Sequence, residues 1–342
     1  MLHIGRSLGS NEKCLVLGFV GFSIPAFNPV WNFITLALKD DFPIAVADIS
    51  KGEVPDYLFF SVFDHKGQWF SWPNNAPHLQ DRYAKCVKIF VCDENVRRIP
   101  WRQTPWHDCD YAITYERSLV SDERHLRVPP YYSYLTHLKD HTGKTIIKPF
   151  DNLVGSRMVL DRKTHFCNFI YSNSSARERI LFFEMLSKYK KVDSGGGVLN
   201  NMGGHKVGDK LKFIEDYKFT IAFENSRDWG YVSEKIVEPM ISYSIPIYWG
   251  CRDIGLDFNA RSFVNANEPV GSDDASLVGH FEKIIREIEH LDTHDDAYLA
   301  TMSEPWYPNN VPNKDCRPEH IREFMQRVFD TRHTRNLRPS SP

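Results

Sequence analysis

A short polar run, Ser233-Glu234-Lys235, stands where the sequence predicts the start of a helix, and its residue types suit the binding of an anion. Ser233 is a favourable N-cap, and apolar residues at helical spacing follow it from 236 to 241. A lysine in the first turn opposes the helix dipole unless an anion lies beside it, and the free N–H groups there favour a phosphate. Neighbouring helix residues do not face each other, so we expect no ion pair between Glu234 and Lys235. The alternative is a solvated helix start, which suits Glu234 better than Lys235.

A second basic helix start follows the predicted strand that ends in Ser172 and Asn173. Arg177 and Arg179 lie in the first turns of that helix, where the N-terminus already attracts anions. Two such helix starts in one domain would hold a pyrophosphate from two sides. The alternative, equally open for this segment, is a pair of surface arginines that bind nearby glutamates.

Carboxylates also follow two of the predicted strands. Glu94 is the central residue of the tripeptide 93–95, and a carboxylate at a strand end is a natural general base. As a bare tripeptide, the same residues are more typical of a turn or a helix cap. Glu224 and Asn225 end a strand with alternating aromatic and aliphatic residues, and a polar loop leads from them to Tyr231.

These residues need a scaffold that brings strand ends together, and the rest of the chain predicts one. The predicted strands are at 14–20, 44–48, 57–63, 87–92, 110–115, 167–171, 218–223, 245–249 and 262–265. The predicted helices are at 177–189, 207–216, 233–243 and 275–291. This alternation is typical of an α/β fold with mainly parallel sheets, in which ligands bind beyond the carboxyl ends of the strands.

Three other stretches affect the organisation of the chain. The polar stretch 138–165 has no clear periodicity, and we interpret it as a linker between two Rossmann-like halves. The glycine-rich run 193–204 is interpreted as a flexible turn, because it lacks the spacing of a phosphate-binding loop. Asp108 and Asp110 have the spacing of a metal-binding Asp-x-Asp pair. Asp110 leads directly into a strand, however, so we predict a turn there and no metal site.

The composition excludes several classes of protein. Of the 342 residues, 42% are hydrophobic and 25% charged, and the formal net charge is −2, which is ordinary for a soluble globular protein and not basic enough for a typical nucleic-acid binder. The seven cysteines include no CxxC pair, which indicates a reducing compartment. Prolines and asparagines interrupt the uncharged run 14–38, so we predict a buried strand and a helix after Pro29 rather than a membrane span. The basic tail 331–342 is predicted to be disordered.

The segments FENS (223–226), GYVSEKI (230–236) and IPIYWG (245–250) resemble, in their order and spacing, the motif of the bacterial α1,3/4-fucosyltransferases, the family that includes the Lewis-antigen enzymes. DFNARSFVN (257–265) continues the match, whereas residues 1–85 match only in general character. The resemblance implies a GT-B fold, with two Rossmann-like domains whose mainly parallel sheets face each other across a cleft.

In that fold, residues 1–150 would form the acceptor-binding domain and residues 151–330 the domain that binds GDP-fucose, with 331–342 as a tail. The resemblance also implies an inverting transfer of L-fucose from GDP-β-L-fucose. Glu94 would be the general base, and Arg179 and Lys235 would hold the pyrophosphate. The residues implied to bind the donor are Ser172, Asn173, Arg179, Glu224, Asn225, Tyr231, Glu234 and Lys235.

Asp93 stands where many relatives have glycine, so its carboxylate would raise the pKa of Glu94 unless it faces away. GDP-fucose would be a co-substrate, and no cofactor or metal ion would be required, although stimulation by a metal stays open. The expected acceptor is an oligosaccharide, with transfer to O3 of GlcNAc in an N-acetyllactosamine-type glycan such as those of a lipopolysaccharide O-antigen, and a Lewis-x-type product.

The expected location is the cytoplasm, with at most peripheral membrane association, and the oligomeric state is open. Two alternatives remain from the residues alone. One is a GT-B enzyme that uses another nucleotide sugar, and the other is a sugar- or nucleotide-binding protein without catalysis.

Overall fold

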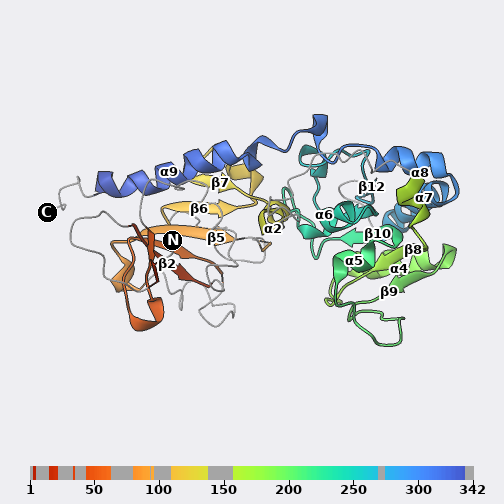
Figure 1. Ribbon diagram of the computed structural model, residues 1–342, viewed down its shortest axis with the longest axis horizontal. Helices are drawn as coiled ribbons and strands as arrows, with labels where there is room; N and C mark the ends of the chain where they lie inside the picture. The colour runs from red at the N-terminus through yellow and green to blue at the C-terminus, as the bar shows by residue number, and fades with distance from the viewer. Residues whose placement is uncertain are drawn as a thin grey trace. The chain divides into compact units, whose positions relative to one another are not determined.

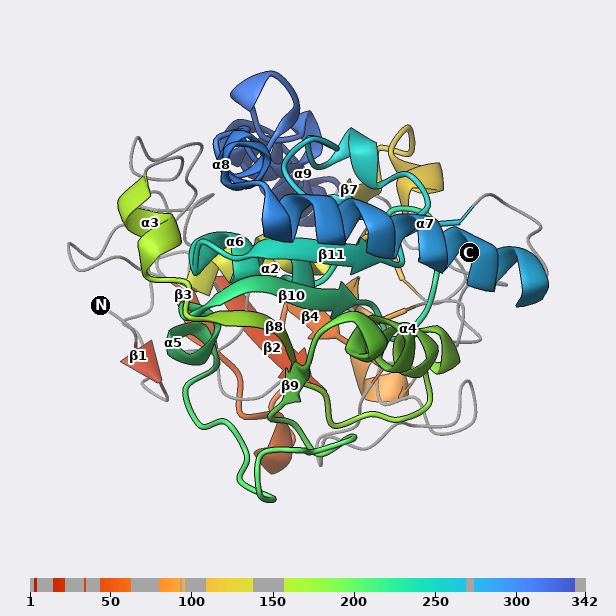
Figure 2. The same cartoon turned by 90° about the vertical axis from the view of Figure 1, so that its right-hand side faces the viewer.

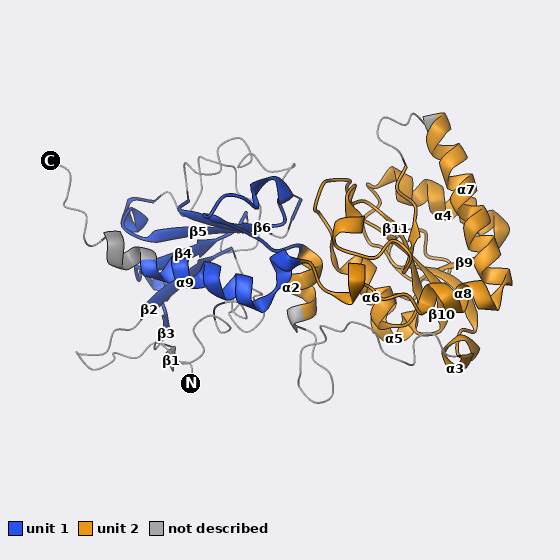
Figure 3. Ribbon diagram, turned by 90° about the horizontal axis from the view of Figure 1, so that it is seen from above, with its two compact units in different colours: residues 1–129, 136–139, 314–342 blue, residues 130–135, 140–313 orange. Residues whose placement is uncertain are grey.

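The structure is a computed structural model (Figure 1, Figure 2). It describes residues 3–4, 15–21, 34, 44–62, 80–92, 94–95, 109–137, 157–268 and 274–335. The chain divides into two units (Figure 3): unit 1 is residues 1–129, 136–139 and 314–342, and unit 2 is residues 130–135 and 140–313. This division differs from the predicted ranges 1–150 and 151–330, because the C-terminal segment belongs with the N-terminal sheet.

Unit 1 contains a seven-stranded parallel sheet with the order β1-β3-β2-β4-β5-β6-β7. The strands are β1 (His3–Ile4), β2 (Leu15–Val20), β3 (Ile44–Val46), β4 (Tyr57–Phe60), β5 (Val87–Cys92), β6 (Tyr111–Thr114) and β7 (His125–Arg127). Short 3-10 helices connect them at Ile49–Lys51, Asp81–Tyr83 and Arg117–Leu119. The sequence YLFF of β4 is buried throughout, as expected for a parallel strand that is covered on both faces. The strand predicted at 14–20 is present as β2, in which residues 17, 18 and 20 are buried and the other three are partly buried.

The C-terminal helix α9 (Pro318–Arg335) packs on this sheet, and Figure 3 draws it in the colour of unit 1. The ring of Phe324 meets Tyr111 edge-on at 5.8 Å, and the Tyr57 hydroxyl donates to the Phe329 carbonyl at 2.6 Å. The predicted disorder of 331–342 is wrong for residues 331–335, which are helical, while 336–342 lie outside the described residues.

A buried ion pair ties the segment before α9 to unit 1. The 3-10 helix Lys314–Cys316 carries Asp315, and Arg127 Nη1 lies 3.5 Å from Asp315 Oδ2. The Arg127 side chain is almost fully buried and also donates from Nε to the Tyr115 carbonyl. The end of β7 thereby fixes the position at which α9 begins.

Unit 2 contains a five-stranded parallel sheet with the order β12-β11-β10-β8-β9. The strands are β8 (His165–Phe169), β9 (Val192–Ser194), β10 (Tyr217–Phe223), β11 (Ile245–Trp249) and β12 (Val264–Asn265). The helices are α2 (Pro130–His137), α3 (Arg157–Asp161), α4 (Arg177–Tyr189), α5 (Lys210–Ile214), α6 (Glu234–Ile241), α7 (Asp274–Thr293) and α8 (Asp295–Met302), with 3-10 helices at Ile254–Leu256 and Pro308–Asn310.

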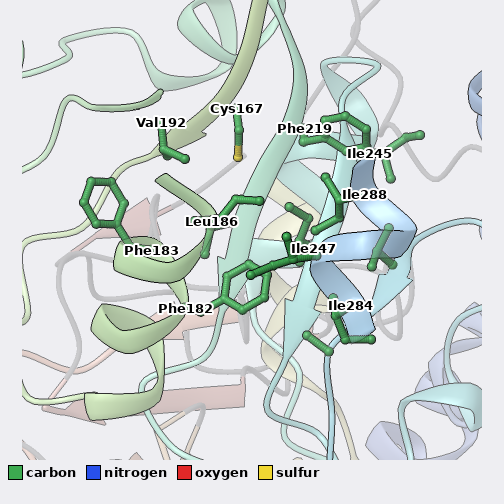
Figure 4. Close-up of a cluster of buried hydrophobic side chains, with 14 of the residues drawn as sticks. Cys167, Phe182, Phe183, Leu186, Val192, Phe219, Ile245, Ile247, Ile284 and Ile288 are labelled. Atoms are coloured by element: carbon green, nitrogen blue, oxygen red, sulfur yellow. The ribbon is translucent and has the colours of Figure 1, made fainter. Parts of the chain in front are cut away.

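An aromatic and aliphatic core joins α4 and α7 to one face of this sheet, and Figure 2 shows the two helices on the same side. The ring of Phe182 on α4 lies 4.9 Å from Phe223 on β10 and 5.0 Å from Phe281 on α7. Figure 4 shows Phe182 close to Ile247 of β11 and Ile284 of α7. Because right-handed crossovers that run in opposite directions place their helices on opposite faces, α6 covers the other face.

The helix predicted at 177–189 is confirmed at both ends, and the other three predicted helices are present with shifted ends. The described part of the predicted linker 138–165 contains α3 and the start of β8, so that part of the interpretation is wrong. Residues 138–156 lie outside the described residues, as does most of the helix predicted after Pro29, of which residue 34 is helical. None of the described helices is both long and apolar enough to span a membrane.

Asp292, at the end of α7, supports a stability prediction. Its buried carboxylate accepts hydrogen bonds from Tyr189 Oη at 3.1 Å, Lys190 Nζ at 2.9 Å and Lys218 Nζ at 3.2 Å. Burial alone would raise the pKa of Asp292, but the hydrogen bonds from the two lysines outweigh it and hold that pKa below its usual value. A depressed carboxylate pKa stabilises the fold above the unfolded pKa of about 4 and ceases to do so as the pH falls through the folded pKa.

We expect Asp292→Asn to lower the free energy of unfolding at pH 7 by about 1–3 kcal/mol, because the variant loses the buried negative charge that the two lysines bind. The loss should stay below that of a fully buried ion pair, since Lys190 is half exposed and solvent screens its attraction to Asp292. The difference from the unaltered chain, measured by urea unfolding, should shrink as the pH falls below about 4. The exposed Asp296→Asn variant is the control and should change little. An equal loss at pH 3 and pH 7 would contradict the role of the charge.

Candidate functional site

The connections of unit 2 diverge between β8 and β10. These two strands are neighbours, yet β8 continues through α4 to β9 on one side and β10 continues through α6 to β11 on the other. Doubly wound sheets bind ligands at such a switch point, outside the carboxyl ends of the strands. The polar residues predicted at strand ends, Ser172, Asn173, Glu224 and Asn225, all lie in the two loops that leave this point.

Arg179 links the two loops through hydrogen bonds from its guanidinium. Its Nη1 donates to the Asn173 carbonyl at 3.1 Å, and its Nη2 donates to the Phe223 carbonyl at 3.0 Å and to Asn225 Oδ1 at 2.8 Å. The guanidinium lies 3.8 Å from the centre of the Tyr171 ring. With 0% of its surface exposed, Arg179 is a buried cation and not the surface arginine of the alternative interpretation.

The charge of Arg179 has no carboxylate within ion-pair distance in the described part of the chain. Its Nε is buried and has no hydrogen-bond partner among those residues, and burial lowers the pKa of Arg179. A buried charge is costly unless an opposite charge compensates it. The N-cap of α4 is Ala176, so no side chain caps the free N–H groups of its first turn. The start of α4 is therefore an electrostatically positive site next to exposed serines.

The start of α6 is organised around Glu224, which is also 0% exposed. Glu224 Oε1 accepts from Ser233 N at 2.7 Å, and Glu224 Oε2 accepts from Ser233 Oγ at 2.7 Å. Lys235 Nζ lies 3.5 Å from Glu224 Oε2, and the Tyr248 hydroxyl donates to Oε1 at 3.4 Å. Ser233 Oγ in turn accepts from Lys235 Nζ at 3.0 Å. Ser233, the predicted N-cap of α6, thus connects Glu224, which follows β10, with Lys235.

The expectation that Glu234 and Lys235 do not pair is wrong, because Lys235 Nζ lies 3.1 Å from Glu234 Oε1. At the first turn both long side chains extend past the helix end, where they can meet although they would not meet across its surface. Burial alone would lower the pKa of Lys235, but Glu224 and Glu234 outweigh burial and raise it. The protein itself therefore supplies the anions that the position of Lys235 demands.

Two glycines make room for this arrangement. Gly250 follows β11 with φ +147°, and a Cβ there would lie 2.4 Å from Glu224 Cγ. A Cβ on Gly196 would lie 2.2 Å from the Tyr171 carbonyl oxygen. The run 193–204 is therefore not the flexible turn that was predicted, since it packs against the end of β8. The side chain of Asn200 holds it by donating to the Gly196 carbonyl at 2.9 Å.

The remaining predicted residues lie where the strand ends place them. Tyr231 is buried at the end of the β10–α6 loop, and the Glu234 side chain is about one-third exposed. Glu94 belongs to unit 1, where it is exposed directly after β5. Its neighbour Asn95 is buried and accepts a hydrogen bond from the Tyr115 hydroxyl at 3.1 Å, which fixes the backbone beside Glu94. Asp93 lies outside the described residues.

The structure agrees with the interpretation of Asp110 as a turn residue, because its carboxylate accepts from the backbone of Lys88 at 2.8 Å just before β6. Among the described residues, no group of three or more metal-binding side chains is present. Sequence reasoning missed Tyr171, Tyr248 and the two glycines. Tyr171 and Tyr248 stand at or next to the last residue of a predicted strand, and Gly250 directly follows one, so position was their only signal. Gly196 follows no predicted strand and carried no such signal.

Comparisons with known proteins agree with this architecture. The family described as "Glycosyltransferase family 10 (fucosyltransferase) C-term" matches residues 160–301, and the family described as "Alpha-(1,3)-fucosyltransferase FucT N-terminal domain" matches residues 17–134. The two units are those of a GT-B glycosyltransferase, each with a Rossmann-like parallel sheet. The chain belongs to glycosyltransferase family 10, the fucosyltransferases.

Among its relatives is the Alpha-(1,3)-fucosyltransferase FucT of Helicobacter pylori, which is 33% identical over 246 residues, or 65% of this chain and 48% of the relative. The Putative fucosyltransferase R654 of Acanthamoeba polyphaga mimivirus is 31% identical over 186 residues, which cover 51% of this chain and 29% of the relative. The chain thus spans about half or less of the length of these curated relatives. A crystal structure of an alpha1,3-fucosyltransferase with GDP-fucose has the same fold, with a TM-score of 0.65 and 24% identity over 95% of this chain and 93% of that one.

Proposed function

We propose that the chain is an inverting α1,3-fucosyltransferase that moves L-fucose from GDP-β-L-fucose to a hydroxyl of an oligosaccharide. The observation that carries the proposal is the buried cation Arg179 at the start of α4, which has no ion-pair partner among the described residues and whose helix has no side-chain N-cap, in a chain that belongs to a fucosyltransferase family. A diphosphate placed at this helix start would compensate the buried charge and accept from the free N–H groups. The solved relative named above contains GDP-fucose, which supports this choice of ligand.

The donor-site residues would then have distinct roles. Arg179 acts through its field and holds Asn225 and Asn173, the residues that shape the two loops. Lys235 and Glu234, which are partly exposed, are placed to touch the donor, the lysine at a phosphate and the glutamate at a sugar hydroxyl. Glu224 is fully buried and would act through Lys235 rather than on the donor.

In the proposed reaction, the acceptor oxygen forms a bond to C1 of fucose while the bond from C1 to the β-phosphate oxygen breaks. Glu94 takes the proton of the acceptor hydroxyl, and the electron pair of the broken bond leaves with GDP. The cations and helix N–H groups stabilise the growing charge on GDP, which is why we propose that no metal ion is required. We further propose O3 of GlcNAc in an N-acetyllactosamine-type glycan as the acceptor position, and the cytoplasm as the location.

The choice of donor is tested with a panel of nucleotide sugars and detection of the product by mass. We expect turnover with GDP-fucose, and the same turnover after addition of a chelator. Turnover with GDP-mannose or a UDP-sugar but not with GDP-fucose would favour another GT-B activity and end the proposal. Activity that a chelator removes and manganese restores would contradict the metal-free mechanism.

The role of Glu94 yields a separate prediction. We expect Glu94→Gln to lower the transfer rate by about 10²–10⁴-fold, the usual contribution of a general base, while GDP binds with unchanged affinity. Glu123→Gln, an exposed glutamate of the same unit, is the matched control and should retain full activity. Unchanged turnover in Glu94→Gln would remove the base assignment. GDP binding without turnover of any donor by the unaltered chain would favour a non-catalytic binding protein.

A further inference from the structure

The loop between β10 and α6, residues 224–233, is held along its length. The buried Asp228 accepts from its neighbour Trp229 N at 2.8 Å through its carboxylate, and its carbonyl accepts from Arg252 N at 3.0 Å. Gly230 N donates to Asp253 Oδ1 at 2.8 Å. The segment that follows β11 therefore fixes the middle of the loop.

A second anchor comes from the segment after β12. Arg227 Nη1 donates to the carboxylate of Glu268, and Arg227 Nη2 donates to the backbone carbonyl of Glu268. The indole N–H of Trp249, at the end of β11, donates to the same carboxylate at 2.7 Å. The loop is consequently a rigid part of the carboxyl edge of the sheet, with two other segments tied to it.

Trp229 differs from the rest of this loop because about half of its surface is exposed to solvent. It is 47% exposed, while every other residue from Tyr217 to Ile254, all of which the structure describes, is buried or only partly exposed. Its indole N–H has no hydrogen-bond partner among the described residues. An aromatic ring of this size is costly to leave exposed, and a rigid loop holds it in one place without covering it.

We propose that Trp229 is a stacking platform for one pyranose ring of the acceptor oligosaccharide. The apolar C–H face of the sugar would lie on the indole ring, and the indole N–H would donate to a sugar hydroxyl, since tryptophan combines an apolar body with one polar donor. The inference rests on the proposed function, because Asn225 and Tyr231 of the same loop belong to the candidate donor site. It assigns to unit 2 a contact with the acceptor, which was expected to bind in the other unit.

Other occupants fit the surroundings less well. To recognise a nucleobase, the site would need free polar groups at the edge of the base, but the nearby carboxylates of Asp228 and Asp253 are already bound to the backbone of the loop. A protein interface would need a much larger patch, on the order of 800 Å² per partner, whereas the loop exposes one ring. A single pyranose matches a single exposed indole.

The test compares Trp229→Ala and Trp229→Phe with the unaltered full-length chain, using N-acetyllactosamine and GDP-fucose. With the ~0.5–1.5 kcal/mol of an aromatic pair as the scale for this contact, we expect the KM for N-acetyllactosamine to rise by roughly 2- to 12-fold in Trp229→Ala and by less in Trp229→Phe. The KM for GDP-fucose and the affinity for GDP should not change. Met158→Ala, at another exposed apolar side chain of unit 2, is the control and should leave both KM values unchanged.

A second readout does not depend on turnover. Titration with N-acetyllactosamine in the presence of GDP should change the tryptophan fluorescence of the unaltered chain, and this change should be absent in Trp229→Phe. An unchanged acceptor KM together with an unchanged fluorescence response would overturn the inference while leaving the fucosyltransferase proposal intact. A loss of GDP affinity in Trp229→Ala, with the acceptor KM unchanged, would instead assign the ring to the nucleobase and also overturn it. Absence of any transfer by the unaltered chain would end the proposed function, and the fluorescence titration would still decide whether Trp229 binds the sugar.

Discussion

Replacement of Glu224 with glutamine is expected to lower the free energy of unfolding by about 3–5 kcal/mol, the usual cost of removing one partner of a buried ion pair. The four groups around its carboxylate are all donors, namely the amide and hydroxyl of Ser233, the hydroxyl of Tyr248 and the ammonium of Lys235. A glutamine of the same shape would place its own NH₂ donors against them and leave Lys235 with Glu234 alone. We expect the affinity for GDP to fall as well, because Ser233 and Lys235 would lose their common anchor.

Urea unfolding and calorimetric titration with GDP measure the two effects. Glu215→Gln, an exposed glutamate in the same unit, is the matched control and should change the stability by less than about 0.5 kcal/mol. A Glu224→Gln variant as stable as the control would show that the buried carboxylate is not what holds the start of α6. Normal stability with lost GDP affinity would indicate direct contact with the donor.

Replacement of Gly196 with alanine is expected to destabilise unit 2 by about 1–3 kcal/mol or more, as overpacking against rigid neighbours does. The new Cβ would lie 2.2 Å from the carbonyl oxygen and 2.4 Å from the amide nitrogen of Tyr171, and backbone atoms cannot turn aside as a side chain can. The displaced Tyr171 carries the guanidinium of Arg179 on its ring, and its hydroxyl donates to the Ile221 carbonyl and accepts from Phe223 N. The positive site at the start of α4 should therefore be distorted, with weaker binding of GDP.

Gly208→Ala is a close control, because a Cβ there meets no atom within 4 Å and the residue lies in the same connection between β9 and α5. We expect it to have nearly the stability and GDP affinity of the unaltered chain. Equal behaviour of the two alanine variants would show that the close approach of Gly196 to Tyr171 has no energetic importance.

The elements predicted from sequence were those whose local pattern is strong. The run YKFTIAF and the amphipathic stretch 177–189 each carry a clear period, and both elements are present as expected. The strands β7 (HLR) and β9 (VDS) were missed because three residues, two of them polar, have no detectable period and become strands only by pairing with a neighbour. The helix α9 was overlooked since its basic end is typical of a disordered tail, although Phe324 and Phe329 bury against the first sheet.

For the candidate site, the sequence predicted the positions of several residues but not their environments. Strand ends can be read from a local pattern, so Asn173, Glu224 and Asn225 were placed correctly at the carboxyl edge of the sheet. Their environments depend on residues distant in sequence. The space for Glu224 comes from Gly250, and the burial of Arg179 comes from the end of β10, more than 40 residues later. No local pattern could show that Lys235 would reach the buried carboxylate of Glu224.

The packing of α9 on the first sheet has a consequence for synthesis of the chain. Unit 2 consists almost entirely of one continuous stretch, whereas unit 1 needs residues from both sides of it. As the chain leaves the ribosome, unit 2 can complete its core before Phe324 and Phe329, which pack on the first sheet, have been synthesised. During that interval apolar surface of the first unit is open to chaperones and proteases, and a message truncated shortly before codon 318 would leave it open permanently.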